Sequence, residues 1–438
     1  MHVTAQEIAT ATGGTLIGVE GVAEAAAVSI DGVSFDSREL QRGQLFVALT
    51  ADRDGHEFVN AAAAAGAAAL LVHRPVDAGI PTILVEDTAT AFMRLAAWGR
   101  DRLADATVVG VTGSVGKTSV KDLTAQVLRT TLRTAANVRS FNNEQGLPHT
   151  VLNAPDDTEA LVLEMGMRGF GEIRRLCEVA RPQLGVVTAV AAAHTERVGG
   201  IEGVIRAKGE LVESLPATGT AVLNGDQPEV RGMAALTSAR ILTFGLTGEV
   251  RVTELQLDDR ARARFVLRTP WGSVPVALPV SGAHMATNAA AAAAVGLSLG
   301  VPLEDVAAGI ADASMSPWRM ELGTARSGAT VINDAYNANP FSMRAALGTL
   351  AALPARRRVA VVGVMAELAD PVRDHLEIAA VAEGLGIELI AFGTDAYGVA
   401  PVIDPVAALG ELGPDTAVLV KGSRVAALEK VAARLVDA

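Results

Sequence analysis

The chain has 438 residues, which is enough for two or three domains that each bury a core of their own. Half of the residues are apolar and only 3% are aromatic, a composition typical of a well-packed α/β protein. The net charge of −12 argues against a nucleic acid or an anionic membrane surface as the main partner, so any phosphate ligand must be held by a few local cations.

Residues 1–87 are predicted to form a small mixed α/β domain. An amphipathic helix is expected over 4–12, and strands over 44–49, 68–72 and 82–85 surround an alanine-rich helix. The first residues show no basic region followed by an apolar run, so we expect no signal peptide and a cytoplasmic protein. The most apolar run, 59–72, is too short to span a bilayer.

Residues 88–314 are predicted to form a central doubly wound domain. Apolar strands over 106–111, 161–164, 184–190, 220–224 and 240–244 alternate with helical segments, which indicates a mostly parallel sheet. Period-two spacing over 260–280 predicts an antiparallel hairpin, and an alanine-rich helix over 285–299 closes the domain. The single cysteine, Cys177, excludes an internal disulfide and is expected to be a small core residue in a reducing compartment.

Residues 315–438 are predicted to form a third, Rossmann-like α/β domain. Short apolar strands are expected over 330–332, 358–362, 388–392 and 417–420, with helices between them. The predicted fold class is therefore α/β, with three domains.

The clearest chemistry lies in the loop that follows the strand over 106–111. The loop and the start of the next helix contain Thr112, Gly113, Ser114, Val115, Gly116, Lys117, Thr118 and Ser119. In such a turn, backbone N–H groups converge on phosphate oxygens, Lys117 reaches the terminal phosphates, and the Thr118 hydroxyl can hold Mg²⁺. Val111 stands where the general pattern has glycine, so Thr112 and Gly113 must shape the start of the loop. We predict a nucleoside-triphosphate site; an ordinary turn with a chance Gly-Lys-Thr is the alternative.

Two polar residues follow other predicted strands. Glu164 ends one strand and His194 comes after another, and carboxyl ends of strands line the ligand crevice of an open α/β sheet. Both side chains are therefore expected near a metal ion held by Thr118, although either alone would more often be a plain strand-end residue. Lys208 falls on the following helix, where a solvated lysine is the ordinary expectation.

Two asparagine-rich runs, over 142–148 and 333–340, suit contacts with a polar substrate and equally suit structural turns. Spacing alone does not decide between these roles. His284 and Asn288 begin the helix that closes the central domain, where capping is a sufficient explanation for both.

Taken together, these motifs resemble the Mur ligases of bacterial cell-wall synthesis, most closely the members that add D-alanyl-D-alanine. The resemblance covers nearly the whole chain. The motifs that fall in family order are Asp36-Ser37-Arg38, the loop from Thr112 to Thr118, Asn142-Asn143, Glu164-Met165-Gly166, His194, Lys208, Asn288, Arg319, Asp334, Tyr336-Asn337-Ala338-Asn339-Pro340 and Lys421-Gly422-Ser423-Arg424. The family's ATP loop lacks the extra glycine, so Val111 is expected there.

The resemblance implies an ATP-dependent ligase that joins D-alanyl-D-alanine to a UDP-N-acetylmuramoyl-tripeptide through an acyl phosphate, acting as a monomer without nucleic acid or membrane. The cofactors it implies are ATP, two Mg²⁺ ions and a carbamylated lysine at Lys208. The implied catalytic residues are Lys117, Lys208, His194 and Arg319; the ATP-binding residues are 112–119 with Asn288, Arg319, Asp334 and Asn337; the metal ligands are Thr118, Glu164, His194 and Lys208; the substrate-binding residues are Ser37, Arg38, Asn142, Asn143, Tyr336, Asn339 and Lys421.

Three positions depart from the family pattern. Asn333 stands where aspartate is usual, Val364 replaces an acidic residue, and residues 50–53 lack an expected glycine. The first two bear on the ATP and dipeptide contacts and the third on the uridine-nucleotide pocket. Two alternatives stay open: a related ligase with another acceptor or amino acid, such as a diamino-acid-adding or folate-type enzyme, and an ATPase that does not ligate.

Overall fold

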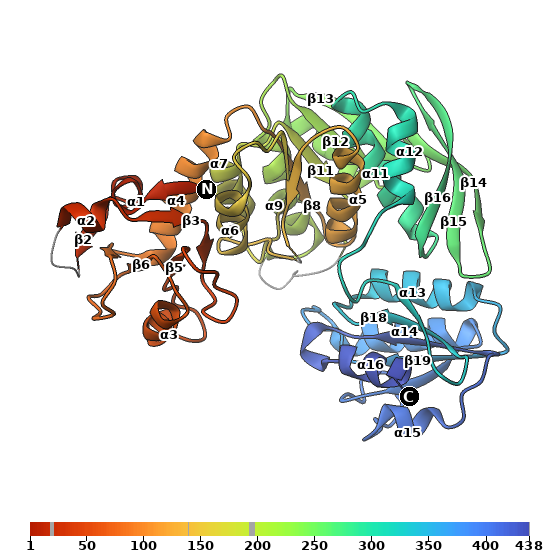
Figure 1. Ribbon diagram of the computed structural model, residues 1–438. Coiled ribbons are helices and arrows are strands. Elements are labelled where there is room, and N and C mark those ends of the chain that lie inside the picture. Colours follow the sequence, from red (N-terminus) through yellow and green to blue (C-terminus); the bar gives the residue numbers. More distant parts are fainter. Residues whose placement is uncertain (18–21, 139, 192–197, 438) are drawn as a thin grey trace. The chain divides into compact units, whose positions relative to one another are not determined.

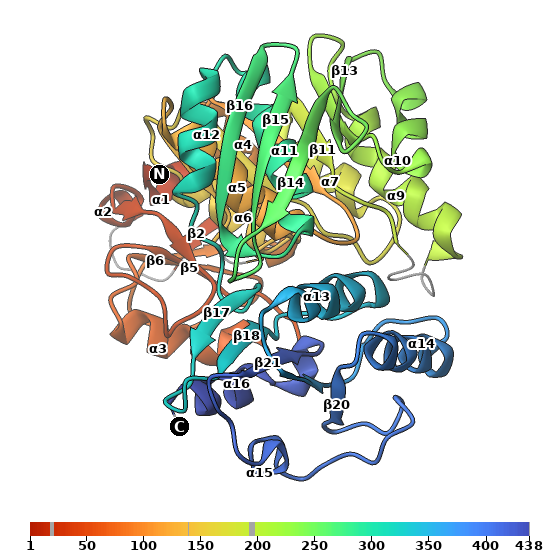
Figure 2. The same ribbon diagram turned by 90° about the vertical axis from the view of Figure 1, so that its right-hand side faces the viewer.

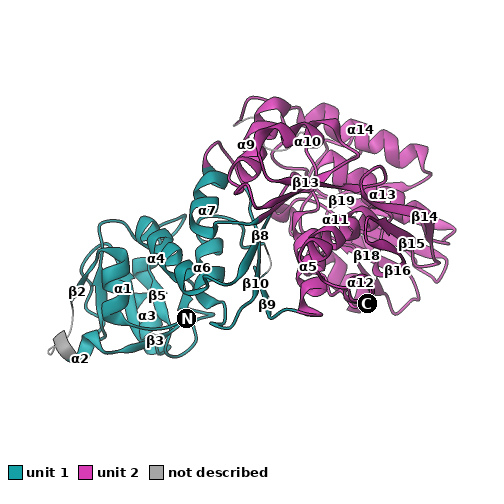
Figure 3. Cartoon of the chain, turned by 90° about the horizontal axis from the view of Figure 1, so that it is seen from above, with its two compact units in different colours: residues 1–110, 132–166, 172–183 teal, residues 111–131, 167–171, 184–438 magenta. Residues whose placement is uncertain are grey.

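The structure is a computed structural model that describes residues 1–17, 22–138, 140–191 and 198–437. By their contacts the residues divide into two units (Figure 3). One comprises Met1–Gly110, Leu132–Gly166 and Glu172–Gln183, and the other comprises Val111–Thr131, Met167–Gly171 and Leu184–Ala438. This division differs from the three predicted segments, whose boundaries at 87 and 314 stay predictions.

The N-terminal segment contains a five-stranded sheet of order β2-β7-β6-β5-β4 (Figure 1), in which β4 to β7 run parallel and β2 is antiparallel. The strands are β2 (Thr15–Ile17), β4 (Val33–Ser34), β5 (Leu45–Val47), β6 (Ala69–Val72) and β7 (Thr82–Leu84), and β1 (His2–Thr4) pairs separately with β3 (Ser29–Asp31). The helices are α1 (Ala5–Thr12), α2 (Val22–Ala26), η1 (Gly55–Phe58) and α3 (Val59–Ala64). Thr4 and Glu7 cap α1 reciprocally, which explains why that helix begins where the sequence predicts.

The central sheet has the order β16-β15-β14-β13-β12-β11-β8-β10-β9. Its strands are β8 (Thr107–Thr112), β9 (Thr134–Ala136), β10 (Ala160–Glu164), β11 (Leu184–Val187), β12 (Thr220–Asn224), β13 (Arg240–Gly245), β14 (Val250–Leu257), β15 (Arg262–Thr269) and β16 (Gly272–Ser281). The pairs from β11 to β14 are parallel, as is β9 with β10, so the predicted doubly wound sheet is confirmed. Figure 2 shows β14, β15 and β16 side by side as an antiparallel extension.

The helices of this part are α4 (Thr88–Arg102), α5 (Lys117–Arg129), α6 (Gly146–Asn153), α7 (Glu172–Ala180), α9 (Ile201–Glu213), α10 (Pro228–Gly232), η2 (Met233–Leu236), α11 (His284–Ser298) and α12 (Leu303–Ala311). The alanine-rich α11 and α12 lie close against α5, because a Cβ on Gly296 or Gly309 would come within 2.7 Å of Val127. Cys177 is buried in α7, with its Sγ 3.7 Å from Sδ of Met165, as expected for a core residue.

The predicted hairpin is confirmed by the pairing of β15 with β16 about residues 270–272. The sequence did not predict β14, which pairs in parallel with β13 and antiparallel with β15. A register shift between Thr253 and Gln256, with Glu254 in a left-handed conformation (φ 56°), interrupts the period-two pattern of this strand. The alternation of apolar and polar residues that predicts a strand is therefore broken at the centre of β14.

The C-terminal segment contains a five-stranded sheet of order β17-β18-β21-β19-β20, parallel except for β17. The strands are β17 (Glu321–Thr324), β18 (Thr330–Asp334), β19 (Arg357–Val362), β20 (Glu388–Ala391) and β21 (Thr416–Lys421), and the helices are α13 (Pro340–Ala352), α14 (Pro371–Gly384), α15 (Pro405–Leu409), η3 (Arg424–Ala426) and α16 (Glu429–Asp437). Alternate strand residues enter two different cores, for example Ile332 and Leu419 in one and Val331 and Val418 in the other. Both faces of the sheet are thus buried, which explains the continuous apolar runs.

In the part of the chain that the structure describes, no helix is both long enough and apolar enough to cross a membrane.

Candidate functional site

The glycine loop joins β8 to α5, as the sequence predicts. Gly113 and Gly116 have φ values of 149° and 82°, which side chains rarely adopt. A Cβ on Gly113 would lie 1.9 Å from Oγ1 of Thr188, and one on Gly116 would lie 2.8 Å from Oδ1 of Asn288. Both glycines are therefore required by backbone conformation and by close neighbours from distant parts of the chain.

The segment after β11 holds the loop in place. Thr188, which is 4% exposed, donates from Oγ1 to the Val115 carbonyl at 2.5 Å. The Ser114 N–H donates to the Ala189 carbonyl at 2.7 Å, and the Ser114 hydroxyl bonds both the N–H and the carbonyl of Ala191. These bonds leave the loop with a fixed backbone. Thr188 was not predicted as a site residue: it falls inside the strand predicted over 184–190, whereas the observed β11 ends at Val187 and leaves Thr188 just beyond it.

Lys117 and Thr118 occupy the first turn of α5. The Lys117 ammonium donates to the Gly113 carbonyl at 2.7 Å, so it lies over the loop. Thr118 is 2% exposed, and Ser119 is also buried. A rigid glycine turn, a helix N-terminus and a lysine folded over them form an arrangement that suits a bound phosphate.

Lys208 lies on α9 and is only 2% exposed, so the ordinary expectation of a solvated lysine is wrong. Burial, and secondly the positive charge of Lys117, lower the pKa of the Lys208 amine well below its usual value. The local sequence did not predict the burial of Lys208, because the charged residues at 206 and 210 are typical of an exposed helix face. Glu210 itself accepts a hydrogen bond from the Gly171 N–H at 2.7 Å.

Glu164 and the first asparagine run belong to the other unit. Glu164 ends β10, is 1% exposed, and accepts a hydrogen bond from Nδ2 of Asn142 at 2.7 Å. Asn143 accepts from the N–H groups of Gln145 and Gly146, so its side chain shapes the turn before α6. Asn142 thus orients a buried carboxylate, whereas the contacts of Asn143 are structural.

His194 lies outside the described residues. Among those that are described, no group of three His, Cys, Asp or Glu side chains is placed to hold a metal ion. Three predicted metal ligands can be placed: Thr118 on α5, Glu164 on β10 and Lys208 on α9.

Capping does not explain His284 or Asn288. The N-cap residue of α11 is Ala283, and no side chain caps this helix. Asn288 instead contacts Met285, with 3.4 Å between Nδ2 and Sδ, and its amide faces Gly116 of the loop. The amide of Asn288 therefore lies between Met285 of its own helix and Gly116 of the loop.

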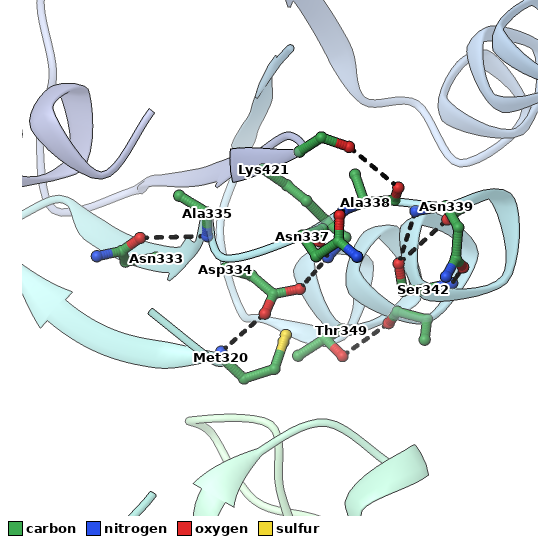
Figure 4. Close-up of polar contacts among 12 residues, drawn as sticks. Met320, Asn333, Asp334, Ala335, Asn337, Ala338, Asn339, Ser342, Thr349 and Lys421 are labelled. Atoms are coloured by element: carbon green, nitrogen blue, oxygen red, sulfur yellow. Dashed lines mark hydrogen bonds and ion pairs between the residues drawn. The ribbon is translucent and has the colours of Figure 1, made fainter. Parts of the chain in front are cut away.

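Asp334 and Lys421 are the last residues of neighbouring parallel strands and form an ion pair (Figure 4). The Lys421 side chain is 2% exposed and also donates to the Asn337 carbonyl at 2.9 Å. The second Asp334 oxygen, Oδ1, accepts from the Met320 N–H at 3.1 Å. The pair fixes the carboxyl edge of this sheet.

Figure 4 also shows that Asn339 caps α13. Its Oδ1 accepts from the Ser342 N–H at 2.9 Å, and the Ser342 hydroxyl accepts from the Asn339 N–H. Asn337 is exposed, whereas Asn339 is 8% exposed. Of the two, only Asn337 has a side chain open to solvent, and the contacts of Asn339 are those of a helix cap.

Arg319 stacks on an aromatic ring. Its guanidinium carbon lies 4.2 Å from the centre of the Tyr336 ring. Its neighbours Trp318 and Met320 have φ values of 62° and 52°, so two side-chain-bearing residues in left-handed conformations flank it. The structure thus brings Arg319 and Tyr336 together.

Arg38 and Ser37 lie in a turn after β4. Arg38 is 85% exposed and forms an ion pair with Asp36 at 2.5 Å. Hydrogen bonding by Arg38 lowers the pKa of Asp36. These residues belong to the N-terminal segment and are far from the glycine loop in sequence.

The residues that depart from the family pattern have ordinary local contacts. Asn333 reaches Glu321 from Nδ2 at 3.3 Å, the Val364 carbonyl accepts from the Ser423 N–H, and the guanidinium of Arg53 stacks on Phe58.

Comparisons with known proteins identify the family. The sequence model described as "Mur ligase middle domain" matches residues 111–296, and that described as "Mur ligase, glutamate ligase domain" matches 318–431. The UDP-N-acetylmuramoyl-tripeptide–D-alanyl-D-alanine ligase of Escherichia coli is 37% identical over 433 residues, which cover 94% of this chain and 95% of that protein. The chain belongs to the Mur ligase family.

Other relatives of this Mur ligase agree. The Mycobacterium tuberculosis protein of the same name is 39% identical over 502 residues, covering all of this chain and 98% of that protein. A crystal structure of MurF from Acinetobacter baumannii superposes with a TM-score of 0.86 at 31% identity, covering 100% of this chain and 99% of that one. The crystal structure of MurF from Thermotoga maritima in complex with ADP superposes with a TM-score of 0.79 at 27% identity, covering 92% of this chain and 96% of that one.

This Mur ligase shares its fold with more distant enzymes. A UDP-N-acetylmuramoyl-L-alanyl-D-glutamate–2,6-diaminopimelate ligase superposes with a TM-score of 0.54 at 20% identity, covering 96% of this chain and 93% of that one. At that identity the likeness concerns the fold alone. This match therefore supports a shared fold and does not support the alternative that the protein adds a diamino acid.

Proposed function

We propose that this Mur ligase joins D-alanyl-D-alanine to a UDP-N-acetylmuramoyl-tripeptide in peptidoglycan precursor synthesis, with ATP and Mg²⁺. The observation that carries the proposal is the match, over nearly the full length of both chains, to relatives that bear this name at 37–39% identity. Because the reaction consumes ATP, we place it in the cytoplasm, where ATP is made.

The reaction has two steps. An oxygen of the tripeptide carboxylate attacks the γ-phosphorus of ATP, the bond from that phosphorus to ADP breaks, and an acyl phosphate forms. The amine of D-alanyl-D-alanine then attacks the acyl carbon, phosphate leaves, and the amine gives up a proton. The first step brings two anions together, so the protein must chiefly position them and neutralise their charge.

The nucleotide is assigned to the glycine loop and the residues around it. Lys117 and Arg319 hold the γ-phosphate, and the backbone of residues 112–119 binds the other phosphates. Asn288 contacts adenine, while Asp334 and Asn337 contact the ribose side. Support comes from the rigid loop, the position of Lys117 over it and the approach of Asn288 to Gly116.

The donor set fits Mg²⁺, which prefers hard oxygen ligands. Glu164 is a buried carboxylate oriented by Asn142, and Thr118 offers a hydroxyl on the first turn of α5. We assign Thr118, Glu164, His194 and Lys208 as the residues that hold two Mg²⁺ ions. Bound there, the ions supply positive charge that offsets the charge of the phosphates.

Lys208 is assigned as a carbamate. The neutral amine attacks CO₂, a bond forms between nitrogen and carbon, and one proton leaves to water, so the neutral amine becomes an anion. A cationic lysine that is 2% exposed and close to the charge of Lys117 is costly, whereas an anion beside divalent cations is stabilised. Burial of Lys208 supports this assignment.

The acceptor is assigned to the remaining predicted residues. Ser37 and Arg38 contact the uridine nucleotide, and Asn142 and Asn143 approach the peptide. Tyr336, Asn339 and Lys421 are assigned to the substrate side of the C-terminal segment. The Arg38 side chain pairs with Asp36, two positions away, and is still 85% exposed, which supports a ligand contact.

The function is tested by phosphate release from Mg²⁺-ATP. The purified protein is given UDP-N-acetylmuramoyl-tripeptide with D-alanyl-D-alanine, or the corresponding dipeptide with a diamino acid. We expect release only with both members of the first pair, and a pentapeptide product by mass. Release with the second pair would assign the protein to the preceding ligation, and release without any acceptor would favour the ATPase alternative.

The carbamate is tested by Lys208→Ala with Lys430→Ala as control, because Lys430 is an exposed lysine. We expect Lys208→Ala to abolish ligation, with partial recovery on adding small carboxylic acids, and Lys430→Ala to match the parent. Carbon-13 NMR after incubation with labelled bicarbonate should show a carbamate signal in the parent that Lys208→Ala lacks. Full activity of Lys208→Ala would remove the carbamate from the mechanism.

A further inference from the structure

Asp122 lies one turn beyond Thr118 on α5 and binds a residue 194 positions away. Its Oδ2 accepts from the Ser316 N–H at 2.8 Å, and its Oδ1 accepts from the Ser316 hydroxyl at 3.1 Å. The Asp122 side chain is 11% exposed, and the buried Lys121 lies 2.7 Å from Oδ1. A carboxylate that accepts two bonds from one residue fixes both the position and the orientation of that residue.

Ser316 belongs to residues 312–320, which join α12 to β17 and carry Arg319. The start of this connection is already fixed, because α12 packs on α5: a Cβ on Gly309 would lie 2.7 Å from the Val127 Cα. The bond to Asp122 extends the fixed part to Ser316. Up to that residue, the connection moves with the helix that begins at Lys117.

The other end of the connection is anchored to the C-terminal sheet. The Met320 N–H donates to Asp334, the Trp318 carbonyl accepts from the Tyr336 N–H at 3.3 Å, and Arg319 stacks on Tyr336. Between these anchors and Ser316 stands only Pro317, whose ring restricts its own φ and the conformation of the residue before it.

We propose that Asp122 is a positioning residue that acts through Ser316 on Arg319. Three residue steps separate Ser316 from Arg319, so their Cα atoms stay within about 11 Å of each other however Pro317 turns. The helix that places Lys117 and Thr118 on the nucleotide thereby also sets the point from which Arg319 reaches the γ-phosphate. The inference rests on the proposed role of Arg319.

The test compares Asp122→Ala with Asp122→Asn, since asparagine can still accept from the Ser316 N–H and donate to its hydroxyl. The two readouts are calorimetric affinities for ADP and for a non-hydrolysable ATP analogue. ADP lacks the γ-phosphate, so we expect Asp122→Ala to leave ADP affinity within twofold of the parent and to lower analogue affinity about tenfold. Asp122→Asn should recover most of that loss. In ligation, kcat of Asp122→Ala should fall at least tenfold.

A variant at Ser316 tests the Ser316–Asp122 contact separately, because it leaves the Lys121–Asp122 ion pair unchanged. Ser316→Ala removes only the hydroxyl bond and should weaken analogue binding two- to fivefold, whereas Ser316→Thr should match the parent. Ser298→Ala, which removes a serine bond to the Ala294 carbonyl inside α11, is the matched control and should change neither affinity.

Equal losses of ADP and analogue affinity in Asp122→Ala, or no loss of either, would overturn the inference. The binding comparison needs no acceptor substrate, so it stands even where the parent fails to ligate. That failure would instead count against the proposed function.

Discussion

The glycine loop allows one prediction to be worked through. In Gly113→Ala the new Cβ would lie 1.9 Å from Oγ1 of Thr188, and the residue would have to keep a φ of 149°. Thr188 must rotate away and lose its bond to the Val115 carbonyl, which costs about 1 kcal/mol. The unfavourable φ costs about 1–2 kcal/mol more. At 1.4 kcal/mol for each factor of ten, ADP affinity should fall about 30- to 150-fold.

A double variant tests the mechanism rather than the loss alone. Thr188→Ala removes the same hydrogen bond, so by itself it should weaken ADP binding about fivefold. Gly113→Ala has already lost that bond, so the double variant should bind ADP with the same affinity as Gly113→Ala. That affinity is about fivefold higher than the value expected if the losses of the two single variants were additive. Calorimetric titration with ADP measures all three. Additive losses, or a Gly113→Ala affinity within threefold of the parent, would refute the steric explanation.

Gly43→Ala is the matched control. Gly43 also has a positive φ, 91°, but a Cβ there would have no neighbour within 4 Å. It carries a backbone cost in the N-terminal segment, outside the residues assigned to the nucleotide, so ADP affinity should not change.

Three further predictions concern stability, measured by urea unfolding of the full chain. Burial lowers the pKa of His56 and His149 below the ordinary 6.5. At a pH between those lowered values and 6.5 the unfolded chain therefore binds more protons than the folded chain, so the free energy of unfolding should fall as the pH drops below 6.5. His149→Gln should make this pH dependence weaker. Gly348→Ala, inside α13 with open space around the new Cβ, should stabilise by about 0.5–1 kcal/mol. Asp334→Ala leaves the buried charge of Lys421 without its carboxylate and should lower the free energy of unfolding by about 3–5 kcal/mol. A decrease below about 1 kcal/mol would mean that water reaches the lysine.

Local patterns were sufficient for much of the fold. The strand, glycine turn and helix around Lys117 are contiguous in sequence, so composition and periodicity could place them. Strands β18 to β21 of the C-terminal sheet are apolar runs and were predicted, whereas β17, which is short, polar and partly exposed, was not. Strand β14 was missed because a bulge at Glu254 breaks its alternation.

The site depended on contacts that no local pattern contains. The hydroxyl of Thr188 meets a loop 73 positions earlier in the chain, and Asn288 faces Gly116 from another helix. The burial of Lys208 follows from how α9 packs, whereas its neighbours in sequence suggest a solvated face. Sequence order could suggest Asn288 and Lys208 through resemblance, but not Thr188, and only the packing of distant elements shows what each one touches.

The ion pair between Asp334 and Lys421 means that their proposed roles are not independent. Asp334 is assigned to the nucleotide and Lys421 to the substrate, yet each already binds the other, and the remaining Asp334 oxygen holds the Met320 N–H beside Arg319. A ribose hydroxyl that approaches this carboxylate can donate to it without displacing Lys421, because a carboxylate accepts several hydrogen bonds. Under these proposed assignments the nucleotide contact and the substrate contact depend on one ion pair, and through Met320 the Asp334 carboxylate also fixes the segment that carries Arg319.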